Sequence, residues 1–213
     1  MKIAFLTLLT TLAFGLAASA EDGWITLFNG KDLTGWKSNE EGEGKTGVFT
    51  VEDGQIKVSG GRSHLFYVGA DGKASFKNFE LKAKFKTMPG ANSGVYFHTA
   101  FQDKNWPDKG FECQVNATHK DRKKTGGLYD IADVMDNAPN KDEVWSEYDI
   151  KVEGKHVVLK IDGKVTTDWT QPEGFVSPKG HLARILSEGT FALQGHDPKS
   201  TTYFKDIVVK PLP

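Results

Sequence analysis

The chain has 213 residues, with 27 basic residues against 28 acidic ones and a formal net charge of −1. This balance, without any block of lysine or arginine, makes nucleic acid and anionic membranes poor partners. The length suits one domain with a sizeable hydrophobic core. Cys113 is the only cysteine, so an internal disulfide is excluded in any compartment.

The first 20 residues have the pattern of a secretory signal peptide. Lys2 precedes an apolar run over residues 3–16, and the small residues A-S-A end at position 20. The run is too short for a stable membrane span, and no second one follows it. We therefore expect cleavage after Ala20, a single mature domain over residues 21–213, and a secreted or periplasmic location without a membrane anchor.

Short runs of alternating apolar and polar residues predict β-strands along the rest of the chain. The predicted strands span residues 48–52, 55–59, 79–87, 94–99, 111–116, 148–152, 157–161, 190–194 and 203–210. Asp53-Gly54 and Asp162-Gly163 lie between such runs, as two-residue hairpin turns do. The stretches 101–110 and 119–144 are predicted to be loops or short turns. Because no helical stripe of ten residues follows the leader, an all-β sandwich of antiparallel strands is expected.

The predicted strand 111–116 carries the most informative pattern. Apolar residues at 111, 113 and 115 alternate with Glu112, Gln114 and Asn116. The alternation directs the apolar side chains, the thiol of Cys113 among them, toward a core. It directs a carboxylate and two amides toward the other face, where they suit a hydroxyl-rich ligand. A solvated outer strand would show the same alternation, so this pattern alone does not decide between the two.

Several motifs together resemble those of the 3-keto-disaccharide hydrolase family. They are L-F-N-G-K-D-L-T-G-W from residue 27, N-S-G-V-Y-F from residue 92, F-E-C-Q-V from residue 111, T-G-G-L-Y from residue 125 and L-Q-G-H from residue 193. The resemblance implies a concanavalin A-like jelly-roll sandwich of two antiparallel sheets with a concave ligand face. It also implies cleavage of an oligosaccharide or glycoside already oxidised to a ketone at sugar carbon 3. An upstream sugar 3-oxidoreductase would have to supply that substrate.

A ketone at C3 acidifies the proton on C2, so a base can remove it and the enolate can expel the group on C1. Water then adds to the unsaturated sugar to complete a net hydrolysis. Glu112 is the leading candidate for the base, because a carboxylate on a sheet is held rigidly. His98, which has the parity of Tyr96 in its strand, is a second catalytic candidate. Tyr129 can donate a hydrogen bond to an oxyanion or a leaving oxygen.

Other residues suit substrate binding or a metal ion. Trp106 lies in a predicted loop, where its ring can stack on a sugar. The further candidates for substrate binding are Asn92, Gln114, Asn116 and His196. Imidazole and carboxylate groups can also hold a divalent ion. The candidate metal ligands are His98, Glu112, His119 and His196, whose spacing is no compact motif, so metal binding stays open.

Three other classes of protein stay open. A retaining glycosidase needs two carboxylates about 5 Å apart, usually on alternate positions of one strand. Gln114 follows Glu112 at that position, and Glu80 or Asp130 could replace the missing carboxylate from another strand. A non-catalytic carbohydrate-binding module needs only the polar face and the aromatic loops. A protein-interaction sandwich would need an exposed apolar patch.

Overall fold

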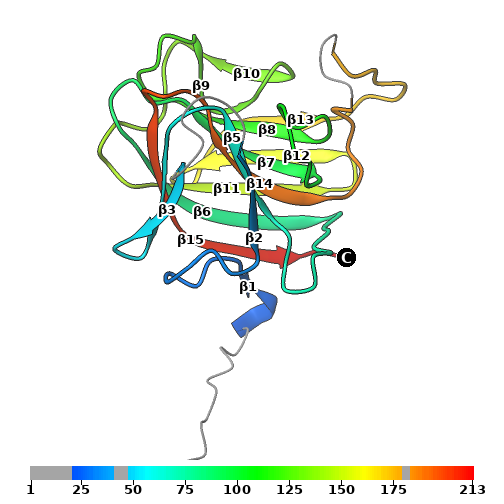
Figure 1. The fold of residues 1–213 in the computed structure, drawn as a ribbon. Helices are drawn as coiled ribbons and strands as arrows, with labels where there is room; N and C mark the ends of the chain where they lie inside the picture. Colours follow the sequence, from blue (N-terminus) through cyan, green and yellow to red (C-terminus); the bar gives the residue numbers. More distant parts are fainter. Residues whose placement is uncertain (1–20, 41–47, 179–182) are drawn as a thin grey trace, which may run out of the picture.

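The computed structural model describes residues 21–40, 48–178 and 183–213, and the predicted signal peptide lies outside these ranges. The described residues form two antiparallel β-sheets packed face to face (Figure 1). A short 3-10 turn, η1 (Glu21–Gly23), precedes the strands. None of the described segments forms a helix that is long and apolar enough to span a membrane. The predicted jelly-roll sandwich is therefore confirmed.

The larger sheet has eight strands. In chain order they are β1 (Ile25–Thr26), β3 (Phe49–Glu52), β4 (Gln55–Ser59), β6 (Phe79–Thr87), β11 (Ser146–Glu153), β12 (His156–Ile161), β13 (Lys164–Thr170) and β15 (Thr201–Pro211). Their order across the sheet is β13-β12-β11-β6-β15-β4-β3, and β1 pairs with β15. Both residues of the Asp53-Gly54 and Asp162-Gly163 turns have positive φ, as tight hairpins require. These two turn predictions are confirmed.

The smaller sheet has seven strands and carries the candidate site. They are β2 (Trp36–Glu40), β5 (Ser63–Tyr67), β7 (Ser93–Thr99), β8 (Phe111–Val115), β9 (Lys123–Leu128), β10 (Ala132–Met135) and β14 (Thr190–Gly195). Their order is β10-β9-β8-β7-β14-β5-β2. Strands β8, β7 and β14 are therefore neighbours in the middle of the sheet, although β14 lies far along the chain from the other two.

The core between the sheets follows the predicted alternation. In β8, Phe111, Cys113 and Val115 are fully buried among the core residues, so the thiol is inert packing as predicted. Glu112 and Gln114 face the other way but are only 6% and 1% exposed. Because both faces of β8 are covered, it is not a solvated outer strand.

The prediction of loops or short turns over residues 119–144 is wrong for residues 123–128 and 132–135, which form β9 and β10. Strand β9 reads K-K-T-G-G-L, without the alternation that identifies a half-buried strand. Its glycines have a packing reason: a Cβ on Gly127 would lie 2.7 Å from the backbone nitrogen of Val134 in β10. Strand β5 was missed for a related reason, since Ser63, His64, Leu65 and Phe66 are all buried and the period of two is absent.

Gly110 directly precedes β8 and has a backbone conformation that favours glycine. Its φ is +91°, and a Cβ there would lie 2.3 Å from the carbonyl oxygen of Phe97. We expect Gly110→Ala to lower the free energy of unfolding by more than about 2 kcal/mol, measured by urea denaturation. Gly90→Ala is the matched control, because Gly90 also has positive φ but would meet nothing within 4 Å. It should cost about 1 kcal/mol, and equal losses would contradict the steric explanation.

Candidate functional site

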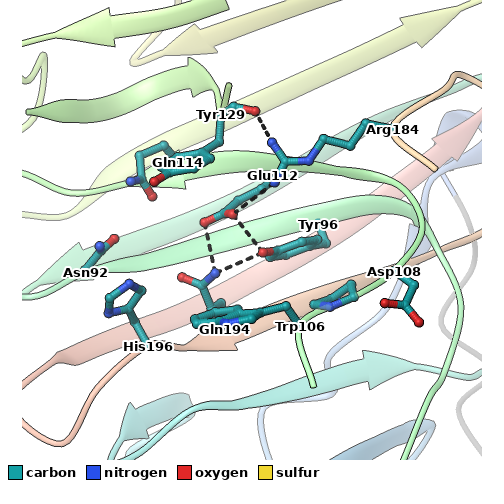
Figure 2. A pocket seen from close by; sticks show the side chains of 11 residues that line it. Asn92, Tyr96, Trp106, Asp108, Glu112, Gln114, Tyr129, Arg184, Gln194 and His196 are labelled. Carbon is teal, nitrogen blue, oxygen red and sulfur yellow. Dashed lines mark hydrogen bonds and ion pairs between the residues drawn. The ribbon is translucent and has the colours of Figure 1, made fainter. Parts of the chain in front are cut away.

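A pocket of about 250 Å³ lies on the face of the seven-stranded sheet that points away from the core (Figure 2). Tyr96 of β7, Glu112 and Gln114 of β8, and Gln194 of β14 contribute its strand residues. Loop residues complete the lining. The volume is just below the range of about 300–1,000 Å³ that is typical of small-molecule sites. The strand residues are rigidly held, which is what a positioned chemical group requires.

Glu112 is the centre of a buried hydrogen-bond network in this pocket. The hydroxyl of Tyr96 donates to its Oε2 atom at 2.7 Å, and the amide of Gln194 donates to its Oε1 atom at 2.9 Å. The same amide lies 3.1 Å from the Tyr96 oxygen. Burial raises the pKa of Glu112, and the hydrogen bond from Tyr96, the charge of Arg184 and the hydrogen bond from Gln194 oppose that rise.

Gly94 makes room for the Glu112 side chain. It pairs with Gln114 across β7 and β8, and a Cβ on Gly94 would lie 2.9 Å from Cγ and from Oε1 of Glu112. The carboxylate can therefore lie flat over the neighbouring strand and reach Gln194 on β14. A glycine inside a strand often marks such a close approach, and this one belongs to the N-S-G-V-Y-F motif.

Arg184 brings a positive charge to the same pocket. Its side chain is 8% exposed, and its Nη2 atom lies 3.9 Å from Oε2 of Glu112. Its Nη1 atom donates to the carbonyl oxygen of Tyr129, and the guanidinium lies 5.6 Å from the centre of the Tyr129 ring. Burial lowers the pKa of Arg184, but a guanidinium stays protonated in proteins. The negative charge of Glu112 and the positive charge of Arg184 thus partly offset each other's cost of burial.

Tyr129 lines the pocket just after the end of β9. Its backbone N–H donates to the carbonyl oxygen of Glu112 at 2.9 Å, which fixes it beside β8. Its hydroxyl donates to Asp121 at 3.3 Å. Burial, followed by the nearby charges of Asp121 and Glu112, raises the pKa of Tyr129 to about 12. The hydroxyl is therefore a hydrogen-bond donor at neutral pH and not a base.

The remaining predicted binding residues in the pocket are Asn92, Gln114, Trp106 and His196. Asn92 is 2% exposed, and its Oδ1 atom has no hydrogen-bond partner among the described residues. Trp106 is 38% exposed and comes from the loop between β7 and β8. Buried amides below an exposed aromatic ring suit a ligand with hydroxyl groups and an apolar face.

His98 does not lie in the pocket, so the expectation that it shares the face of Glu112 is wrong. The β7–β14 register shifts between the pairs Tyr96–Ala192 and Thr99–Thr190, and His98 has a φ of 53° in this bulge. The strand parity is lost there, and the ring packs against Phe79. Nε2 donates to the carbonyl oxygen of Lys77 at 2.8 Å, while Nδ1 accepts the Ser187 N–H. Both nitrogens of His98 are thus used by the fold.

Asn116 is also a structural residue and does not line the pocket. Its amide nitrogen donates to the carbonyl oxygens of Asp121 and Lys123, and its Oδ1 atom accepts the backbone N–H of His119. The side chain therefore organises the turn between β8 and β9. The expectation that Asn116 binds substrate is not supported by this geometry, because its hydrogen-bonding groups are already occupied.

A second cluster, formed by His119, His196 and Asp197, borders the pocket. Each offers one ligand atom, and these atoms lie within 4.8 Å of one another. His196 Nδ1 lies 2.9 Å and His119 Nε2 3.9 Å from Oδ2 of Asp197. Burial alone would raise the pKa of Asp197, but hydrogen bonds from Ser200, His196 and Lys199 lower it to about 2. Two imidazoles and one carboxylate suit a divalent transition metal.

The four predicted metal ligands thus do not come together. Only His119 and His196 share the cluster; Glu112 has its own donors, and His98 lies in the bulge. Nδ1 of His119 accepts the backbone N–H of Asp121 at 3.1 Å, which places the proton of the neutral ring on Nε2. His119 must therefore change tautomer, and lose this hydrogen bond, before Nε2 can bind an ion.

Sequence reasoning missed several residues of the site. Those missed are Tyr96, Pro107, Asp108, Arg184 and Gln194 in the pocket and Asp197 in the cluster. Tyr96 and Gln194 stand in recognised motifs, and their strand positions carry the signal that could have identified them. Asp197 follows the L-Q-G-H motif directly. Arg184 lies in an irregular segment before β14, where no periodicity indicates the direction of a side chain.

Known proteins with similar sequences and structures include carbohydrate-active enzymes. Over residues 23–210 the sequence matches the family described as 3-keto-alpha-glucoside-1,2-lyase-like domain. A Bacteroides thetaiotaomicron protein named 3-keto-disaccharide hydrolase is 30% identical over 235 residues, covering 90% of this chain and 79% of that protein. A crystal structure of a candidate glycosyl hydrolase from Parabacteroides distasonis has a TM-score of 0.74 at 24% identity, covering 90% of this chain and 94% of that one.

A carbohydrate-binding module from Bacillus subtilis has the same fold, with a TM-score of 0.53 and 17% identity over 83% of this chain and 96% of the module. The fold and the polar pocket define a concanavalin A-like β-sandwich with one hollowed ligand face. Within that class, the chain belongs to the 3-keto-alpha-glucoside-1,2-lyase-like family. The resemblance seen in the sequence motifs is confirmed.

The cluster of His119, His196 and Asp197 gives a direct test of metal binding. We expect Mn²⁺ or Zn²⁺ to bind the metal-stripped protein in calorimetry, and Asp197→Asn to abolish binding because it removes the charged ligand. Asp108→Asn is the control, since Asp108 lines the pocket but lies outside the cluster. Binding that survives in Asp197→Asn, or is lost only in Asp108→Asn, would contradict this assignment.

Proposed function

We propose that the protein cleaves 3-keto-glycosides by removing the C2 proton and expelling the aglycone from C1, with water addition giving net hydrolysis. The observation that carries this proposal is the buried carboxylate of Glu112, held by Tyr96 and Gln194 inside the pocket. Family membership supports the substrate class, because the relative from B. thetaiotaomicron is named a 3-keto-disaccharide hydrolase.

Glu112 acts as the base in this mechanism. A proton next to a ketone is only weakly acidic, so a base that is more basic than a solvated carboxylate removes it more readily. Burial shifts the pKa of Glu112 in that direction. The two donors occupy one lone pair on each oxygen, and a carboxylate has further acceptor positions for the C2 proton.

Arg184 and Tyr129 stabilise the charges that the reaction moves. Proton abstraction transfers negative charge from Glu112 to the enolate oxygen, and Arg184 lies beside Glu112, with Nη2 3.9 Å from Oε2. A fixed cation at this place favours the enolate without any reorganisation of solvent. Tyr129, whose hydroxyl stays protonated, can donate to the leaving oxygen. His196, Asn92 and Gln114 line the same pocket and would bind sugar hydroxyls.

The arrangement of carboxylates supports elimination over double displacement. Glu80, one of the two possible second carboxylates, pairs with Lys82 on the other sheet. The other, Asp130, forms an ion pair with Lys123 and is not among the residues that line the pocket. Asp108 does line it, but on a loop. A retaining glycosidase needs two carboxylates aimed at one bond from opposite sides, whereas elimination needs one base.

The proposal also includes the cellular setting. The leader pattern of residues 1–20 favours a secreted or periplasmic enzyme. Its substrate, a sugar with a ketone at C3, would come from a separate oxidoreductase. Neither nucleic acid nor membrane has a part in this function.

Glu112→Gln tests the function directly. The amide keeps the size of the side chain but cannot take a proton, so we expect release of the aglycone from a 3-keto-glucoside to fall by about 10²–10⁴-fold. The unoxidised glucoside should not be cleaved by either protein. Glu80→Gln, which changes a carboxylate on the other sheet, should keep full activity. The assay follows free aglycone by chromatography, with and without added Mn²⁺.

The outcomes separate the two functions that the fold allows. Equal cleavage of the keto and unoxidised glucosides would contradict elimination through a C3 ketone. Binding of either sugar by the wild-type protein, with no release of aglycone from either, would identify a non-catalytic carbohydrate-binding module. Retention of activity in Glu112→Gln would show that another residue is the base.

A further inference from the structure

A buried histidine without a hydrogen-bond partner among the described residues lies beside the pocket, against the rings of Tyr96 and Trp106. His64 of β5 is 0% exposed, and neither ring nitrogen has a partner among the described residues. Burial, reinforced by the charge of Arg62, lowers the pKa of His64 to about 3, so the ring is neutral. A neutral imidazole has one donor and one acceptor. A buried polar group without a partner destabilises the fold, so the position of this ring calls for an explanation.

His64 continues a polar row that begins in the pocket. It pairs with Gln194 on the neighbouring strand β14, and Gln194 donates to Glu112 and lines the pocket. The Oε1 atom of Gln194 is also buried without a partner, as is Oδ1 of Asn92. Two residues that line the pocket and the neighbouring His64 thus have unused hydrogen-bonding atoms, whereas the Glu112 carboxylate accepts two hydrogen bonds.

Trp106 covers His64. The two rings meet edge to face with centroids 5.4 Å apart, and the Trp106 ring lies 5.6 Å from that of His196. Trp106 comes from a loop whose main chain is held by Gln102, which donates to the Trp106 carbonyl oxygen at 2.9 Å. The ring is 38% exposed and lies outside the hydrophobic core, and the guanidinium of Arg62 lies 5.6 Å from its centre.

We propose that His64 and Trp106 form a second sugar subsite, which binds a sugar ring next to the one held at Glu112. This inference rests on the proposed function for its substrate class. Rotation of Trp106 exposes the two nitrogens of His64 to sugar hydroxyls, and the indole ring stacks on the apolar face of the same sugar. Hydroxyl groups both donate and accept, which matches the one donor and one acceptor of His64.

The test compares a 3-keto-disaccharide with a methyl 3-keto-glucoside, which lacks the second ring. The variant His64→Phe keeps an aromatic ring but removes both nitrogens. We expect it to raise KM for the disaccharide about tenfold and to leave KM for the methyl 3-keto-glucoside unchanged. Phe101→Leu is the control, because it changes an aromatic residue of the same loop that contacts Phe66 and not His64. Thermal unfolding checks that both variants fold.

If His64→Phe changes KM equally for the two substrates, or changes it for neither, the proposed subsite is wrong and His64 is a packing residue. Calorimetry with unoxidised sugars keeps the test separate from catalysis. If the protein cleaves nothing, the subsite still predicts that a glucose disaccharide binds the wild type more tightly than methyl glucoside, and that His64→Phe removes this difference. Equal affinity for both sugars, or no binding of either, would contradict the proposal.

Discussion

The site depends on one constraint, which is a carboxylate held away from water in the middle of a sheet. An unpaired buried charge would be too costly to tolerate, so Glu112 needs donors on every side from which water is excluded. Tyr96 and Gln194 supply them from the two next strands, and Arg184 supplies a charge from the segment before β14. The same groups that make the buried carboxylate stable also fix its direction and set its basicity.

The sandwich makes this arrangement possible because its strands come from distant parts of the chain. Strand β14 inserts beside β7, and so places Gln194 within reach of a carboxylate 82 residues earlier. Gly94 leaves room for this carboxylate, because a Cβ there would lie 2.9 Å from Cγ and Oε1 of Glu112. Loops then complete the pocket, with Trp106 on one side and Tyr129 on another (Figure 2). A rigid sheet thus positions the reacting group while loops shape the ligand space.

The sequence predicted those parts of the site that follow strand alternation. The period of two placed Glu112 and Gln114 opposite the core, and the structure agrees. It failed at His98, where a bulge adds one residue and reverses the direction of the side chain. Arg184 could not be found, because irregular segments carry no period. Strand β9 was missed because its glycines pack closely against β10 rather than forming an apolar stripe.

The most direct measurement is the fate of the C2 hydrogen when a 3-keto-glycoside is turned over in D₂O. Removal of this proton by Glu112, followed by hydration of the unsaturated sugar, puts a solvent deuteron on C2. Proton NMR of the released keto sugar should therefore show no C2 hydrogen, at times when the keto sugar alone in D₂O has not exchanged. A product that keeps its C2 hydrogen would contradict elimination and show that the bond to C1 is cleaved by direct displacement.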